Sequence, residues 1–262
     1  MNLLHLGIIF GAGCLAGIMN SIAGGGTLIT FPALVWHGLP PVTANATNSF
    51  ALWPGSLSAA WGYRHELGPG EKKYLRLLVP SLAGAIIGAI LLRMTPDRLF
   101  ARIIPFLVLL ATLLFMAQEP MQRWLRSRRA EPPQTSVTDT APTTRWTIQA
   151  WLAQFLTGIY GGYFGAGMGI IMLATLGMIG LTDIHKMNSV KNILGFCINF
   201  SAGLWLAYAG LVRWPEALVM MAGAIIGGYF SAGVAQRLGR QFARRAVIVI
   251  GFLLFALLLF KS

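Results

Sequence analysis

The sequence has little charge and almost no cysteine. Of its 262 residues, 11% are charged and 56% are hydrophobic. This composition lies outside the range of soluble globular proteins and predicts a membrane protein. The two cysteines, Cys14 and Cys197, stand alone in apolar segments, so the sequence gives no support for a disulfide framework or a zinc site.

Acidic residues are the scarcer charge. Eight Asp and Glu stand against 20 Lys and Arg, and all eight fall in expected loops or at expected helix ends. A core without carboxylates disfavours a proton relay or a cation site inside the membrane, and it disfavours an intramembrane enzyme that needs a carboxylate pair. We therefore expect no catalytic residues, no metal site and no cofactor.

The basic excess gives a net charge of +12, which in a soluble protein would suggest a nucleic-acid partner. Here the basic residues lie in short connections between apolar runs, as the positive-inside rule describes for membrane proteins. We therefore expect the lipid bilayer as the partner and no nucleic acid.

Apolar runs recur along nearly the whole chain, and a helix that spans the bilayer needs about 20 such residues. The sequence predicts an all-α, polytopic bundle of about eight long transmembrane helices and two short broken or re-entrant helices. The long helices are expected at 3–22, 44–63, 74–92, 99–118, 147–164, 187–210, 214–235 and 243–260. The short ones, at 27–37 and 168–181, each follow a glycine-rich break.

An internal repeat divides the chain. The hexapeptide "AGAIIG" occurs at 83–88 and again at 222–227, an offset of 139 residues. The glycine breaks "AGGGT" and "FGAGM" match at an offset of 141, and "TNS" and "MNS" match at an offset of 140. We expect a first repeat at 1–118, a Pro-, Thr- and Arg-rich cytoplasmic loop at 119–146, and a second repeat at 147–262. The small residues of "AGAIIG" predict close helix packing in lipid.

The distribution of basic residues favours inverted repeats. If the short segments count as passes, each half makes five, and the second half enters the membrane in the opposite orientation. Apart from Lys191, five basic residues then lie outside and fourteen lie inside with the 119–146 loop. Parallel repeats would give the weaker split of 11 to 8, so the positive-inside rule favours inversion. Inverted repeats with broken helices are typical of secondary transporters.

Polar residues gather on two of the expected helices. Asn45, Asn48 and Ser49 share one helix face, and Asn188, Lys191 and Asn192 repeat the same spacing. Ser189 follows Asn188 directly. A lysine inside a membrane helix is costly unless it faces a cavity or a partner. We expect Lys191 to face an anion, although it could instead snorkel to the cytoplasmic interface.

The glycine breaks add backbone N–H groups. A helix that starts near Thr27 or Met168 offers the positive end of its dipole to an anion. The candidate residues are Gly25, Gly26, Thr27, Gly167, Met168 and Gly169. The glycines could alternatively serve close packing alone. A phosphate loop is excluded because "GGGT" lacks the following Lys and Ser or Thr.

Three stretches resemble the TauE/SafE sulfite exporter family, also called the toluene-sulfonate uptake permease family. They are "SIAGGGTLITFPALVWHGLPPVTANATNSFALWPGSLSAAWGYRHEL", "AGAIIGAILLRMTPDRLF" and "YGGYFGAGMGIIMLATLGMIGLTDIHKMNSVKN". The resemblance implies a multi-pass carrier of sulfite, sulfonates or related anions in the bacterial inner membrane. It places the family's glycine-rich segments on Gly24–Thr27 and Gly165–Gly169, and its polar helix starts on Asn48, Ser49, Asn188 and Ser189.

The sequence therefore predicts a secondary transporter for a small sulfur-containing anion, bound between the two repeats. A carrier of another small anion, such as a carboxylate or thiosulfate, stays open. So do a membrane-embedded enzyme, an accessory subunit, and the question of a homo-oligomer. The direction of transport and the coupling ion are not fixed by the residues.

The inverted arrangement makes a testable prediction about topology. Five passes in each half place both chain termini on the outside. A reporter fused after Ser262 that is active only outside the cytoplasm should therefore be active. Cytoplasmic activity of this fusion would exclude the arrangement.

Overall fold

The computed structural model describes residues 3–22, 25–62, 64–66, 68–127, 144–181, 183–238 and 240–261. These residues form ten α-helices and two 3-10 segments, and no β-strand occurs among them. The predicted all-α class is confirmed. Residues 128–143 of the predicted loop, and Gly24 of the first glycine break, lie outside the described residues.

The helices fall into two series of five. The first is α1 (Leu3–Ile22), α2 (Thr27–Trp36), α3 (Pro41–Gly62), α4 (Leu78–Met94) and α5 (Asp97–Ser127). The second is α6 (Thr144–Tyr163), α7 (Met168–Met178), α8 (Ile184–Tyr208), α9 (Trp214–Leu238) and α10 (Arg240–Lys261). The 3-10 segments are Arg64–Glu66 and Pro69–Leu77.

The short helices α2 and α7 begin at Thr27 and Met168, as the sequence predicted. The helices that follow them, α3 and α8, each begin three residues earlier than predicted. Pro41 supplies the first residue of α3, a position that proline favours, and Asp183 accepts a bond from the backbone N–H of Lys186 at the start of α8, at 3.4 Å. The candidate amides therefore lie inside these helices rather than at their first residues.

The two short helices also end alike. Gly38 follows α2 with φ 97° and Gly180 follows α7 with φ 92°, a conformation that only glycine adopts easily. Leu39 then donates to the carbonyl of Leu34 at 3.2 Å, and Leu181 donates to that of Leu176 at 3.0 Å. This is the Schellman ending, and it turns the chain sharply into α3 and α8.

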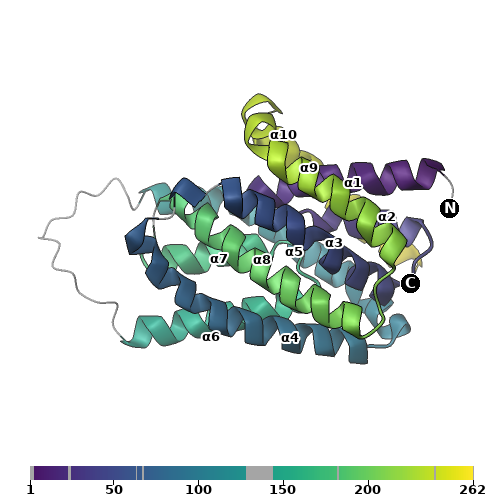
Figure 1. Cartoon of the computed structure of the whole chain (residues 1–262), viewed down its shortest axis with the longest axis horizontal. Coiled ribbons are helices and arrows are strands. Elements are labelled where there is room, and N and C mark those ends of the chain that lie inside the picture. Colours follow the sequence, from purple (N-terminus) through teal and green to yellow (C-terminus); the bar gives the residue numbers. More distant parts are fainter. Residues whose placement is uncertain are drawn as a thin grey trace, which may run out of the picture.

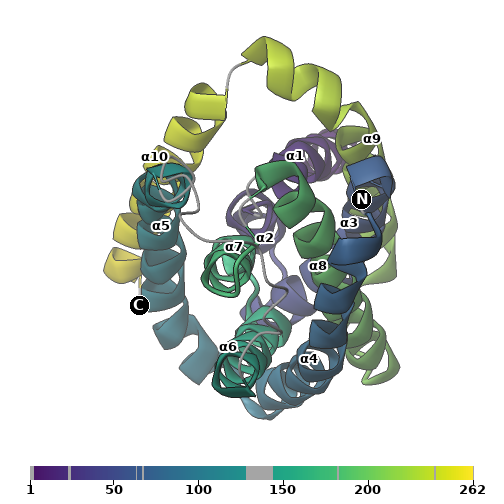
Figure 2. The same cartoon turned by 90° about the vertical axis from the view of Figure 1, so that its left-hand side faces the viewer.

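The helices run roughly along the long axis of the molecule (Figure 1). α1 begins and α10 ends at one end, which we call the terminal end; α5 ends and α6 begins at the other, the loop end (Figure 1). Viewed along the bundle, α2 and α7 lie in the middle and the other helices surround them (Figure 2). Leu34 of α2 and Leu176 of α7 are both 0% exposed, as expected for helices that are apolar on all sides.

Contacts between helices come in matched pairs. α1 packs most extensively against α9, and α6 packs in the same way against α4. α2 contacts α10, and its counterpart α7 contacts α5. Two further contacts join a helix to its own counterpart: α3 contacts α8, and α5 contacts α10. The most extensive contacts in one series of five thus have counterparts in the other.

Three helical stretches are long and apolar enough to cross a membrane by length and composition: Lys73–Met94, Asp97–Ala117 and Lys186–Tyr208. Five shorter apolar helices accompany them in the described part of the chain. The predicted number of eight long spans is therefore not established by this criterion.

Glycines of the "AGAIIG" repeats lie where the paired helices touch. A Cβ atom on Gly88 would clash with the backbone carbonyl of Ile159 in α6, and one on Gly227 would clash with the carbonyl of Cys14 in α1. These glycines therefore let two helix backbones approach directly, as small residues do in membrane helix pairs.

Substitution of Gly227 by alanine should destabilise the protein by about 1–3 kcal/mol, because the added methyl group forces α1 and α9 apart. Gly11 of α1 is the matched control, since a Cβ there meets nothing within 4 Å. Its alanine variant should be neutral or stabilising by up to about 1 kcal/mol. Thermal unfolding of the purified proteins in detergent measures both, and equal melting temperatures for the two variants would contradict this packing role.

Candidate functional site

Asn48 of α3 is bonded to both threonines of α2. Its Nδ2 donates to Thr27 Oγ1 at 3.2 Å, and its Oδ1 accepts a short hydrogen bond from the hydroxyl of Thr30. All three side chains are buried. The Asn48 amide is therefore satisfied by the protein itself, whereas Asn45 Oδ1 has no hydrogen-bond partner in the described structure. Thr30 was not among the candidates, although it lies three residues after Thr27 on the same helix face.

The first glycine break is filled by protein atoms. The backbone N–H of Gly26 donates to Asn20 Oδ1 at 2.8 Å. A Cβ on Gly26 would lie 2.8 Å from the Cβ of Ala16, and one on Gly25 would enter the ring of Phe115. Close packing thus accounts for both glycines, and a backbone donor at the start of α2 is already used.

Asn45 and Ser49 also serve contacts between helices. Asn45 Nδ2 donates to the carbonyl of Tyr163, the last residue of α6, at 2.7 Å. The carbonyl of Ser49 lies 3.3 Å from the position of a Cβ on Gly203 in α8. These two residues of α3 therefore help to join the two halves of the chain.

The second repeat lacks these satisfied pairs. Asn188 and Asn192 are 5% and 4% exposed, and within the described structure Asn188 Oδ1 and Asn192 Nδ2 have no hydrogen-bond partner. At the offset of 141, Met168 and Ile171 of α7 stand where α2 has Thr27 and Thr30. The hydroxyl partners are therefore missing. A buried polar group without a partner is costly, by about 1–3 kcal/mol, and in native proteins it calls for an explanation such as a bound ion or water.

A cavity adjoins these residues. It encloses about 300 Å³ of empty space, including part of its opening, and is lined by Asn20, Ser56, Met168, Gly169, Met172, Lys191, Asn192, Gly195 and Asn199. The lining comes from the end of α1, from α3, from the start of α7 and from α8. Four of the candidate residues, Met168, Gly169, Lys191 and Asn192, line this cavity.

Lys191 does not snorkel to the surface. It is 2% exposed, and its helix α8 places it on the cavity beside Asn192. Among the described residues that line the cavity, none is acidic. A lysine and amide groups at one cavity are groups that can bind an anion.

The start of α7 contributes backbone at the cavity. Gly167 precedes the helix with φ 78°, and no side chain caps the helix there. Met168 and Gly169, its first two residues, line the cavity. No side chain caps α2 either, but the N–H of Gly26, the residue before α2, donates to Asn20. The positive end of the α7 dipole therefore adds to the charge of Lys191.

The other candidate residues are buried but do not line the cavity. Among them are Gly167 before α7 and Ser189 on α8. Asn20, Ser56, Met172, Gly195 and Asn199 line the cavity and were not predicted. Helical spacing could have found three of them. Gly195 and Asn199 lie three and seven residues after Asn192, on the same helix face. Ser56 lies seven residues after Ser49. No pattern in the sequence marks Asn20.

Metal-binding side chains do not gather in the described part of the chain. Within it no group of three His, Cys, Asp or Glu side chains is placed to hold a metal ion.

Comparison with known proteins gives consistent results. The chain is 27% identical to a probable membrane transporter protein of Haemophilus influenzae over 98% of its own length and 95% of that protein. It is also 27% identical to the probable membrane transporter protein YfcA of Escherichia coli, over 99% and 91% of the two chains. A probable membrane transporter protein of Bacillus subtilis, YunE, is 22% identical over 86% and 87%. No solved structure matches the chain.

The family model described as "Sulfite exporter TauE/SafE" matches residues 9–258, which is nearly the whole chain. The glycine breaks, the two polar helices and the cavity all lie within this match. The chain belongs to the sulfite exporter TauE/SafE family.

Proposed function

We propose that the protein is a secondary membrane transporter that binds a small sulfur-containing anion, sulfite or an organosulfonate, in the Lys191 cavity. One observation carries the proposal: a buried lysine and the unpartnered Nδ2 of Asn192 line a cavity without acidic residues. An ammonium group, amide donors and a helix N-terminus are the groups that stabilise an oxyanion. The family description and the names of the relatives, which are probable transporters, agree with transport.

The packing supports two inverted repeats. The matched helix contacts relate α1–α5 to α6–α10. α2 runs back along α1, since Gly26 lies against Ala16 and the ring of His37 lies 5.1 Å from that of His5. Each half then makes an odd number of passes, which inverts the second half and places the terminal end outside. Rocking of one repeat against the other would expose the cavity to each side in turn.

Replacement of Lys191 by alanine should weaken anion binding about 10- to 100-fold, because a hydrogen bond to a charged group contributes about 1.5–3 kcal/mol. Uptake and export in proteoliposomes, and thermal stabilisation by sulfite, measure the loss. Lys186→Ala is the matched control, since Lys186 lies on the same helix and does not line the cavity. Unchanged transport by the Lys191 variant would remove this residue from the site.

Leucine substitutions at Asn192 and at Asn48 should distinguish a residue that binds the anion from one that stabilises the fold. Leu52 is the repeat counterpart of Asn192 at the offset of 140, so Asn192→Leu introduces the residue of the other half. It should leave the melting temperature without anion unchanged or raised, and should reduce the stabilisation by anion. Asn48→Leu should destabilise the protein by about 1–3 kcal/mol, because Thr27 and Thr30 lose their partner.

Both variants are measured by thermal unfolding with and without sulfite, sulfate, thiosulfate, taurine and simple carboxylates, since a ligand that binds the folded state raises its stability. Selective stabilisation by a carboxylate would redirect the proposal to another anion. Loss of sulfite stabilisation in Asn48→Leu but not in Asn192→Leu would contradict the proposal, because it would place the anion site beside Asn48 of the first repeat.

A further inference from the structure

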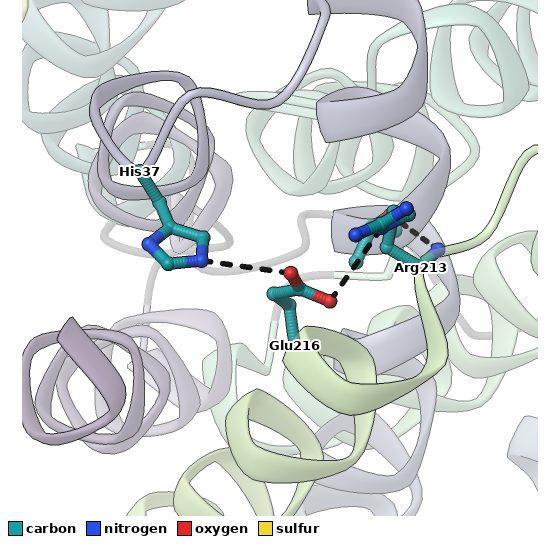
Figure 3. A network of polar contacts seen from close by, with 4 residues as sticks. His37, Arg213 and Glu216 are labelled. Carbon is teal, nitrogen blue, oxygen red and sulfur yellow. Dashed lines mark hydrogen bonds and ion pairs between the residues drawn. The ribbon is translucent and has the colours of Figure 1, made fainter. Parts of the chain in front are cut away.

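A buried carboxylate lies at the terminal end of the bundle, away from the anion cavity. Glu216, in the first turn of α9, is 3% exposed. Its Oε1 lies 3.5 Å from Nε2 of His37, and its Oε2 lies 3.9 Å from Nε of Arg213 (Figure 3). The sequence placed Glu216, like the other acidic residues, in a loop or at a helix end; the fold brings it together with His37.

Glu216 depends on a nearby positive charge. A buried carboxylate is strongly disfavoured unless it is paired. The Arg213 side chain is 64% exposed and is the more distant partner, whereas the His37 side chain is 14% exposed. Histidine is the side chain whose charge ordinarily changes between pH 5 and pH 8, so a proton on His37 decides the strength of this pair.

Both groups lie at helix ends. His37 directly follows α2, at the negative end of that helix dipole, and Glu216 lies at the positive end of α9. A protonated histidine is stabilised at a helix C-terminus and a carboxylate at a helix N-terminus. The pair therefore joins the end of α2 to the start of α9.

The cluster also reaches α3 and α1. The backbone N–H of Arg213 donates to Thr47 Oγ1 on α3 at 3.1 Å, and the ring of His5 on α1 packs edge-on against His37.

Of the other described charged groups at this end, Asp97 accepts a bond from Val42, Arg93 lies over the ring of Trp205, and Arg98 and Arg102 are exposed. His5 is thus the one further titratable ring in contact with the pair, among the described side chains.

The residues at the matching positions of the loop end cannot form such a pair. At the repeat offsets, Leu77 corresponds to Glu216 and Met178 corresponds to His37. Leu77 is buried like Glu216, but it carries no charge. The two repeats therefore differ in charge at these positions.

α2 connects the pair to the anion cavity. It is 10 residues long, or about 15 Å. At its start, Asn20, which lines the cavity, accepts a bond from Gly26, and at its end lies His37. Movement of this one helix changes both places.

We propose that His37 and Glu216 form a proton-binding site that gates the terminal end of the transport pathway. Protonated His37 pairs with Glu216 and keeps α2 docked on α9 and α3, and loss of the proton releases α2 and opens this end. The proposal rests on the proposed transport function, but the gate is measured without any anion.

The test uses the full chain in nanodiscs, with Cys14 and Cys197 replaced by alanine and a single cysteine introduced as Ala44→Cys. Ala44 is 0% exposed and lies one turn before Thr47 on α3. The rate of maleimide labelling at Ala44→Cys is divided by the rate at Tyr208→Cys, because Tyr208 is 90% exposed at the end of α8. This division removes the pH dependence of the thiol reaction itself. The labelling ratio should be about fivefold lower near pH 5.5 than near pH 8, as for a partly exposed ion pair.

His37→Gln and Glu216→Gln should each make the ratio high at every pH, whereas His5→Gln, the matched control, should keep the pH dependence. A ratio that does not vary with pH in the parent would overturn the gate. So would a pH dependence that survives in both His37→Gln and Glu216→Gln, or one that disappears only with His5→Gln.

Anion-induced stabilisation, measured on the same variants, keeps the two proposals apart. Both gate variants should still be stabilised by sulfite, because neither residue lines the cavity. Loss of sulfite binding in every protein, parent included, would refute the proposed anion and leave the labelling result valid.

Discussion

Backbone packing of α1 against α9, and of α4 against α6, sets the ring of helices around α2 and α7. In lipid no hydrophobic gain drives helices together, so close contact and polar bonds must hold them. Gly227 and Gly88 supply that contact, since a side chain at either position would meet a backbone carbonyl. The ring encloses two short helices whose irregular starts could not face lipid, because their backbone groups would have no partners there.

The two central helices have the same shape but different chemistry. α2 carries Thr27 and Thr30, which satisfy Asn48, and its first N–H is taken by Asn20. α7 carries apolar residues at the matching positions, so the amides of α8 keep unused hydrogen-bonding capacity. The Asn48 amide of the first half is thus satisfied by α2, whereas amide atoms of Asn188 and Asn192 in the second half are not satisfied by α7. This asymmetry is what distinguishes the proposed anion cavity from the matching region of the first repeat.

The same contrast recurs at the ends of the bundle. A titratable pair stands at the terminal end, and uncharged residues take the equivalent places at the loop end. Because α2 extends from the cavity to the pair, occupancy of the two places acts on a single helix. A transporter needs coupling of this kind, since its access must change with what it has bound.

Composition, hydropathy and the repeated "AGAIIG" determined the helical class, the two series of five helices and the family, because these follow from local sequence and from matches along the chain. Helical spacing also placed Lys191 and Asn192 on one face. Only the tertiary structure decided that Asn48 is satisfied, that Asn20 reaches the cavity and that Glu216 meets His37. Each of these depends on residues from different helices, whose relative positions are set by packing and leave no periodic trace in the sequence.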